Sequence, residues 1–117
     1  MTENQLLAAV RQLIKLNGLL GYHTHRSDRS EPGFPDQTIL HVESGRLAFA
    51  ELKTDKGRLT APQRTWLNGL ARTRNVVVFV WRPADLLDGT IHRELRALAT
   101  GKRTRLPGEA DGRPVVL

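Results

Sequence analysis

The sequence predicts an α/β domain with a mixed β-sheet, in which an antiparallel hairpin precedes a βαβ crossover and helices flank the sheet. Two observations predict the sheet. Ser44-Gly45 is a favourable two-residue turn between the alternating segments 38–42 and 46–50, a pattern typical of a hairpin. Val76–Trp81 is a continuous apolar run rich in β-branched residues, which is typical of a strand buried on both faces beside a parallel neighbour.

Two capping boxes predict where helices begin. Residues 2–16 open with Thr and carry Gln three residues later, before apolar residues at helical spacing. Residues 60–72 repeat the pattern with Pro in the first turn, so the second helix lies inside the crossover. A last helix is predicted within residues 84–99, where Gly89 could break it.

Length and charge bound the possibilities. The 117 residues suffice for one domain, which we place at residues 1–100, with residues 101–117 as a basic tail that could be flexible. The absence of cysteine excludes disulfide scaffolds and thiolate metal sites. A net charge of +6 and a pI of about 10.8 fit a nucleic-acid-binding protein. No signal-peptide pattern and no apolar run of membrane-spanning length is found, so a cytoplasmic protein without a membrane partner is predicted.

The hairpin register predicts a cluster of charged side chains. With a two-residue loop, Glu43 pairs with Arg46, and the same register puts Asp36 opposite Lys53. Because side chains alternate along a strand, Glu51 shares a face with Lys53 and lies diagonal to Asp36. Two acids and a lysine at one end of an apolar face indicate a metal-dependent phosphodiesterase site. A solvated strand face often carries Glu-x-Lys as well, and geometry alone favours neither interpretation.

Other side chains near this site have a structural and a functional interpretation. Glu3 lies in the first turn of a helix, where the dipole favours an acid, and a role as metal ligand is the minor alternative. Gln63 can close its own capping box or point into the site, since its helix begins just after Lys53. Four basic loop residues are interpreted as phosphate contacts: Arg26, Arg29, Lys56 and Arg58.

Six sequence blocks in order resemble a known family: Tyr22-His23-Thr24-His25, Ser30-Glu31-Pro32-Gly33-Phe34-Pro35-Asp36, Glu51-Leu52-Lys53-Thr54, Gly57-Arg58-Leu59-Thr60, Gln63-Arg64-Thr65-Trp66 and Trp81-Arg82-Pro83-Ala84-Asp85. Together they resemble the PD-(D/E)XK nuclease core, and within it a VRR-NUC domain of the compact stand-alone type of phages and bacteria. The resemblance covers residues 22–95, with residues 2–16 as the first helix. One departure is Gln37, where relatives usually carry an apolar residue.

The resemblance implies a restriction-endonuclease-like fold and a set of site residues. It implies that Asp36 and Glu51 bind Mg²⁺ or Mn²⁺, with the backbone carbonyl of Leu52 as a further ligand. It implies that Lys53 is the third catalytic residue and that Gln63 is a second-tier catalytic candidate. All three principal catalytic positions are intact in this sequence.

The function implied is a divalent-metal-dependent DNA nuclease. No base-reading motif is found in the sequence, so structure-selective cleavage of branched, flapped or Holliday-junction DNA is predicted, with endonuclease and exonuclease action both open. The resemblance further implies a homodimer, located in the host cytoplasm if the protein is phage-encoded. The alternative is a non-catalytic nucleic-acid-binding protein that retains the nuclease fold, and a purely structural or interaction protein is the least favoured interpretation.

Overall fold

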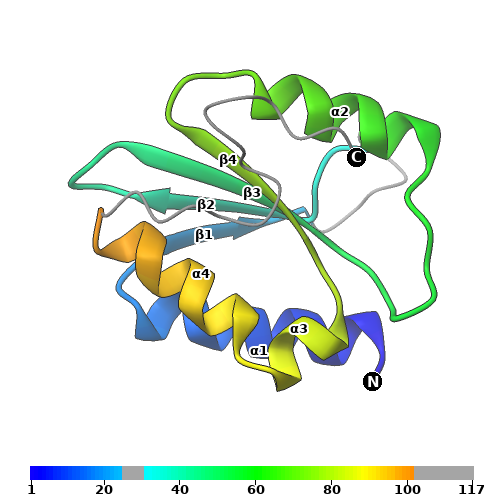
Figure 1. Cartoon of the computed structure of the whole chain (residues 1–117), viewed down its shortest axis with the longest axis horizontal. Coiled ribbons are helices and arrows are strands. Elements are labelled where there is room, and N and C mark those ends of the chain that lie inside the picture. The colour runs from blue at the N-terminus through cyan, green and yellow to red at the C-terminus, as the bar shows by residue number, and fades with distance from the viewer. Residues whose placement is uncertain (25–30, 102–117) are drawn as a thin grey trace.

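The computed structural model describes residues 1–24 and 31–101; Arg26, Arg29 and the basic tail from residue 102 onward lie outside the described residues. The elements run in the order α1 (Glu3–Leu16), β1 (Leu20–His23), β2 (Gln37–His41), β3 (Arg46–Leu52), α2 (Ala61–Ala71), β4 (Val76–Trp81), α3 (Pro83–Leu87) and α4 (Thr90–Ala99). The four strands form one sheet in the order β1-β2-β3-β4. The pairs β1–β2 and β2–β3 are antiparallel, and β3 and β4 are parallel (Figure 1). The predicted α/β class with a mixed sheet is confirmed.

Helices cover both faces of the sheet. Helix α2 lies over one face, and α1, α3 and α4 lie over the other (Figure 1). The larger hydrophobic core joins α1 and α4 to one face of the sheet through Ile39, Ala50 and Trp81, among others. A smaller cluster under α2 is built on Phe49, Leu67 and Val78. Strands β3 and β4 therefore bury side chains on both faces, which is why their sequences are almost continuously apolar.

Both predicted capping boxes are present. In α1 the Thr2 hydroxyl accepts from the Gln5 N–H at 3.1 Å, and the Gln5 side chain accepts from the Thr2 N–H at 2.8 Å. Thr60 and Gln63 make the same reciprocal pair at the start of α2. Gly89, with φ of +83°, separates α3 from α4 as predicted. The local sequence signals for helix starts and breaks are therefore confirmed. Trp66 on α2 is 37% exposed.

The hairpin register differs from the prediction. His41, rather than Glu43, pairs with Arg46, so residues 42–45 form a four-residue loop. The Gly45 N–H donates to the His41 carbonyl at 2.9 Å, and Gly45 adopts a φ of +71° that favours glycine. Val42 belongs to this loop and is 65% exposed.

The predicted register is wrong about which residues of β2 and β3 are paired, but it is correct about the face of the sheet on which each side chain lies. A shift of two residues returns every side chain to the same face, because the strand repeat is two residues. Gln37 pairs with Ala50, so one further step places Asp36 opposite Glu51 instead of the predicted Lys53. The two acids are thus brought closer together than the predicted diagonal arrangement would allow.

Glu94 on α4 is a buried acid outside this cluster. It is 6% exposed, and its Oε2 has no hydrogen-bond partner in the described part of the chain. Burial raises the pKa of Glu94 to about 7, and the charge of Asp85 contributes to this increase. The nearby Trp81 indole lowers the pKa, although its N–H makes no hydrogen bond of good geometry with a described residue. Folding therefore requires this side chain either to bind a proton or to bury a charge.

We expect Glu94→Gln to stabilise the protein above pH 7. Because the folded-state pKa lies above the ordinary 4.5, the folded protein binds more protons, and stability falls as pH rises from about 4.5 to about 7. Glutamine carries no charge, so the variant should gain about 1–2 kcal/mol over the wild type at pH 8 and almost nothing at pH 4. Urea unfolding at both pH values measures this difference, and a pH-independent difference would contradict it.

Candidate active site

Asp36 lies where β1 and β3 end and β2 begins. Its Oδ2 accepts a hydrogen bond from the Leu52 N–H at 2.8 Å, at the end of β3. Its backbone carbonyl accepts from the Thr24 N–H at 3.2 Å and from Nδ1 of His23 at 3.1 Å, beside the end of β1. Because a carbonyl can only accept, Nδ1 of His23 carries the proton. The Asp36 carboxylate therefore has a fixed position against β3.

Glu51 lies next to Asp36 and is nearly inaccessible, at 4% exposed. Its Oε1 accepts from the Gln63 amide at 3.0 Å, while its Oε2 is buried without a partner among the described residues. Burial raises the pKa of Glu51 far above its usual range, and the charge of the neighbouring Asp36 raises it further. Glu51 is therefore protonated at neutral pH when no cation is present.

Gln63 fulfils both of its predicted roles at once. Its Oε1 accepts from the Thr60 N–H at 2.8 Å and closes the capping box of α2. Its Nε2 donates to Glu51, so the same side chain joins the start of α2 to the site. This is possible because a carboxamide has an acceptor and two donors on separate atoms.

A glycine contact brings α2 to the site. Gly33 has a φ of +91°, and a Cβ there would lie 2.4 Å from the carbonyl carbon of Pro62 and 2.6 Å from the Gln63 nitrogen. The Trp66 indole N–H donates to the Pro32 carbonyl at 3.1 Å, and its ring packs edge-on against Phe34 with centroids 5.1 Å apart. The segment that carries Asp36 is therefore packed directly on the first turns of α2. This contact was not predicted, although Gly33 in the segment Gly33-Phe34-Pro35-Asp36 was a visible signal for it.

The charges of Lys53 and Glu3 also act on Glu51. Lys53 directly follows β3, its N–H donates to the Trp81 carbonyl at 2.9 Å, and its charge lowers the pKa of Glu51. The charge of Glu3 acts in the opposite direction and raises that pKa. Glu3 also lines a cavity of about 130 Å³ together with Asp36 and Leu52. The structure thus places Asp36, Lys53 and Glu3 near Glu51.

The backbone of Leu52 contributes to the same place. Its N–H points at Asp36, and the N–H and C=O of one strand residue are directed to the same neighbouring strand. The Leu52 carbonyl is therefore directed to the Asp36 side of β3, where it could serve as a metal ligand.

The loop after β3 carries Lys56 and Arg58, both exposed. Arg82, at the end of β4, fixes this loop: its Nη1 donates to the carbonyls of Thr54 and Gly57, each at 2.6 Å. This role of Arg82 was not predicted from the sequence, where the residue belongs to the last block of the family resemblance. The other two predicted phosphate contacts lie outside the described residues.

The donor set fits a hard divalent cation. Within residues 1–24 and 31–101, no group of three or more His, Cys, Asp or Glu side chains is arranged to hold a metal. Asp36 and Glu51 supply two carboxyl groups, and the unpartnered Oε2 of Glu51 is an oxygen that a cation would satisfy. Mg²⁺ commonly takes one or two carboxylates and completes its shell with waters and substrate phosphates. An all-oxygen set of this kind suits Mg²⁺ or Mn²⁺.

Comparisons with protein-family models, with curated proteins and with solved structures give no match for this chain. The resemblance to VRR-NUC domains therefore stays a prediction from the sequence, and the functional argument depends on the geometry above. Within the described residues, no helix combines the length and apolar character needed to cross a membrane.

Proposed function

We propose that this protein is a divalent-metal-dependent nuclease with a restriction-endonuclease-like fold. The observation that supports this most strongly is the position of Asp36 across from Glu51, with Asp36 hydrogen-bonded to the Leu52 N–H and Glu51 nearly inaccessible. Such an arrangement is costly for folding alone, and pKa values perturbed by burial and like charge are typical of functional sites. A divalent cation bound between the two carboxylates would compensate their charge.

Each residue at the site has a chemical role in this proposal. Asp36, Glu51 and the Leu52 carbonyl would hold the cation, which polarises the scissile phosphate and activates a water molecule. Lys53 orients or helps to deprotonate that water, or stabilises the charge that develops on phosphorus. Gln63 fixes the orientation of Glu51 through its amide hydrogen bond. Glu3 is too exposed for a firm ligand and acts at most through the outer shell.

The proposed substrate is DNA recognised through its backbone. The net charge of +6 and the exposed Lys56 and Arg58 favour phosphate contacts, which position a duplex but carry no sequence information. We therefore propose structure-selective cleavage of branched, flapped or junction DNA, by a homodimer where the substrate is a four-way junction. Arg26 and Arg29 belong to the same proposal as further phosphate contacts.

A panel of labelled linear, flapped and four-way-junction DNAs tests this function. With Mg²⁺ or Mn²⁺ we expect cleavage of at least one branched substrate, and with EDTA none, because the carboxylate pair acts through the metal. Asp36→Asn, purified in the same way, controls for contaminating nuclease and should not cut. Tight binding of branched DNA without cleavage under either metal would instead favour the non-catalytic binding protein.

A further inference from the structure

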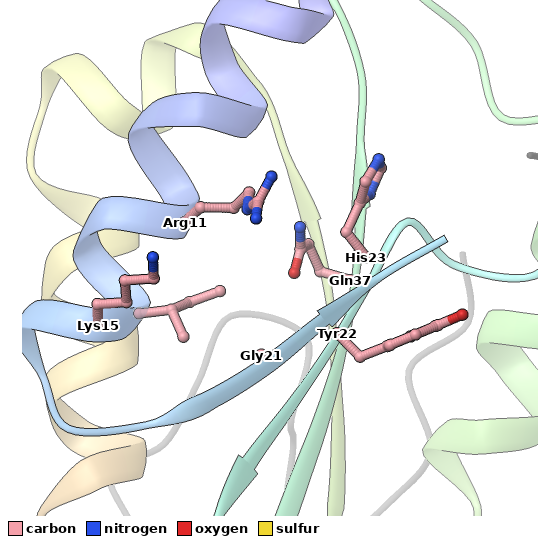
Figure 2. Close-up of a pocket in the computed structure, with 7 residues that line it drawn as sticks. Arg11, Lys15, Gly21, Tyr22, His23 and Gln37 are labelled. Atoms are coloured by element: carbon pink, nitrogen blue, oxygen red, sulfur yellow. The ribbon is translucent and has the colours of Figure 1, made fainter. Parts of the chain in front are cut away.

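A second cavity, of about 180 Å³, lies between α1 and β1 and belongs to none of the groups assigned above (Figure 2). Gln37 lies at its base. Since Gln37 follows Asp36 along the chain, its side chain points to the opposite face of the sheet, toward α1. His23 pairs with Gln37 across the strands and lines both this cavity and the cavity beside Asp36. The two cavities are therefore neighbours.

The polar groups of this cavity are mainly hydrogen-bond donors. Gln37 is 1% exposed, and its Nε2 has no hydrogen-bond partner within the part of the chain that the structure describes. Arg11 and Lys15, one turn apart on α1, supply two exposed cations at the cavity, and Figure 2 shows the Arg11 guanidinium extending toward Gln37. Arginine, lysine and an amide NH₂ all donate, so the complementary ligand is an anion with several acceptor oxygens.

Gly21 keeps the cavity open. A Cβ at this position would lie 3.1 Å from Cγ2 of Ile14 and 3.8 Å from Oε1 of Gln37. Any other residue would therefore narrow the space between α1 and β1 directly above the Gln37 amide. Gly21 lies within a strand, so no turn requires a glycine at this position. A glycine within a strand often marks the close approach of another group.

We propose that this cavity binds a backbone phosphate of the nucleic acid, one that flanks the scissile phosphate near Asp36. That the ligand is a nucleic acid rests on the proposed function. That it is an anion rests on the hydrogen-bond donors that line the cavity. A phosphate offers enough oxygens to accept from Arg11, Lys15 and Gln37 together, and arginine matches phosphate through paired N–H groups. The buried amide of Gln37, which departs from the apolar residue that the family resemblance implies, then has its partner.

Gln37→Met separates this role from a structural one. Methionine fills a similar volume without the amide, so the variant should be as stable as the wild type or more stable, since an unpartnered buried donor is removed. Its affinity for a labelled single-stranded oligonucleotide in EDTA should fall about three- to tenfold. Loss of affinity together with unchanged or higher stability is the expected pair of results. Unchanged affinity would overturn the inference.

Arg11→Gln tests the charge at the cavity. The slope of log K against log salt should decrease by about 0.7 for the single-stranded probe, which is the loss of one phosphate contact. The matched control is Arg72→Gln, which removes an equal, exposed charge at the far end of α2 and should leave the slope unchanged. An equal change in both variants would mean that only the net charge matters, and would overturn the inference.

Inorganic phosphate tests the cavity directly. In NMR titrations at constant ionic strength, the side-chain NH₂ of Gln37 should shift saturably with phosphate and not with chloride, and Arg11→Gln should abolish the response. No response to phosphate overturns the anion site. A phosphate response with unchanged DNA affinity in Gln37→Met overturns the assignment to DNA.

None of these measurements uses metal or cleavage. A protein that binds phosphate here but never cuts DNA refutes only the proposed function, whereas one that cuts DNA with an unresponsive Gln37 refutes only the inference.

Discussion

Lys53→Ala is expected to slow DNA cleavage by about 10²- to 10⁴-fold while DNA binding and metal binding at saturation stay close to those of the wild type. An ammonium group carries three donors and no acceptor, so it cannot ligate Mg²⁺. Lys53 nevertheless lies close enough to Glu51 for its charge to lower the pKa of that acid. Its contribution should therefore belong to the chemical step, through the attacking water or the charge on phosphorus.

Single-turnover cleavage at saturating DNA and saturating Mn²⁺ measures this effect. Saturation is needed because loss of the Lys53 charge raises the pKa of Glu51 further. A metal ion must then displace a more tightly held proton from Glu51, so it binds more weakly. Lys56→Ala, an exposed lysine on the same loop, is the matched control and should weaken binding without slowing the saturated rate. The double variant with Asp36→Asn should be little slower than either single variant, because the groups act as a unit. Equal saturated rates for wild type and Lys53→Ala would exclude a catalytic lysine.

The hairpin illustrates what the sequence could and could not predict. Alternation of apolar and polar residues predicts which face each side chain occupies, so Asp36 and Glu51 could be placed together from the sequence. It does not distinguish a two-residue from a four-residue loop, because both give the same faces. The predicted opposition of Asp36 and Lys53 was wrong for this reason, and the loop that decides it is stabilised by His41 and Gly45, whose contact is not encoded in the alternation.

Contacts between segments that are distant in the sequence could not be predicted from local patterns. Capping boxes and the β4 run are local signals, and the elements that they predict are present. The approach of Gly33 to α2, the Arg82 bonds to the loop after β3 and the burial of Gln37 each depend on how finished elements pack. For Gln63 the sequence offered two alternatives, and the structure realises both because they use different atoms of one amide.

Glu51→Gln is expected to abolish cleavage and yet to stabilise the metal-free protein at neutral and alkaline pH. The folded-state pKa of Glu51 is raised above the ordinary 4.5, so the folded protein takes up a proton and stability falls as pH rises above that value. A glutamine has no charge to bury and no repulsion with Asp36, and its carbonyl oxygen can still accept from Gln63. The gain at pH 8 in EDTA should be about 1–3 kcal/mol.

Added metal should reverse the order of the two proteins. A ligand that binds only the folded state stabilises it by about 2.7 kcal/mol at a concentration of 100 times its Kd, so the wild type should gain stability with Mn²⁺ while Glu51→Gln gains little. Urea unfolding in EDTA and in Mn²⁺, beside a cleavage assay, measures both effects. Glu94→Gln is the matched control, since it makes the same change at a buried acid on α4 and should keep metal stabilisation and cleavage. If Mn²⁺ stabilised Glu51→Gln as much as the wild type, Glu51 would not be a metal ligand, and its burial beside Asp36 would need a structural explanation.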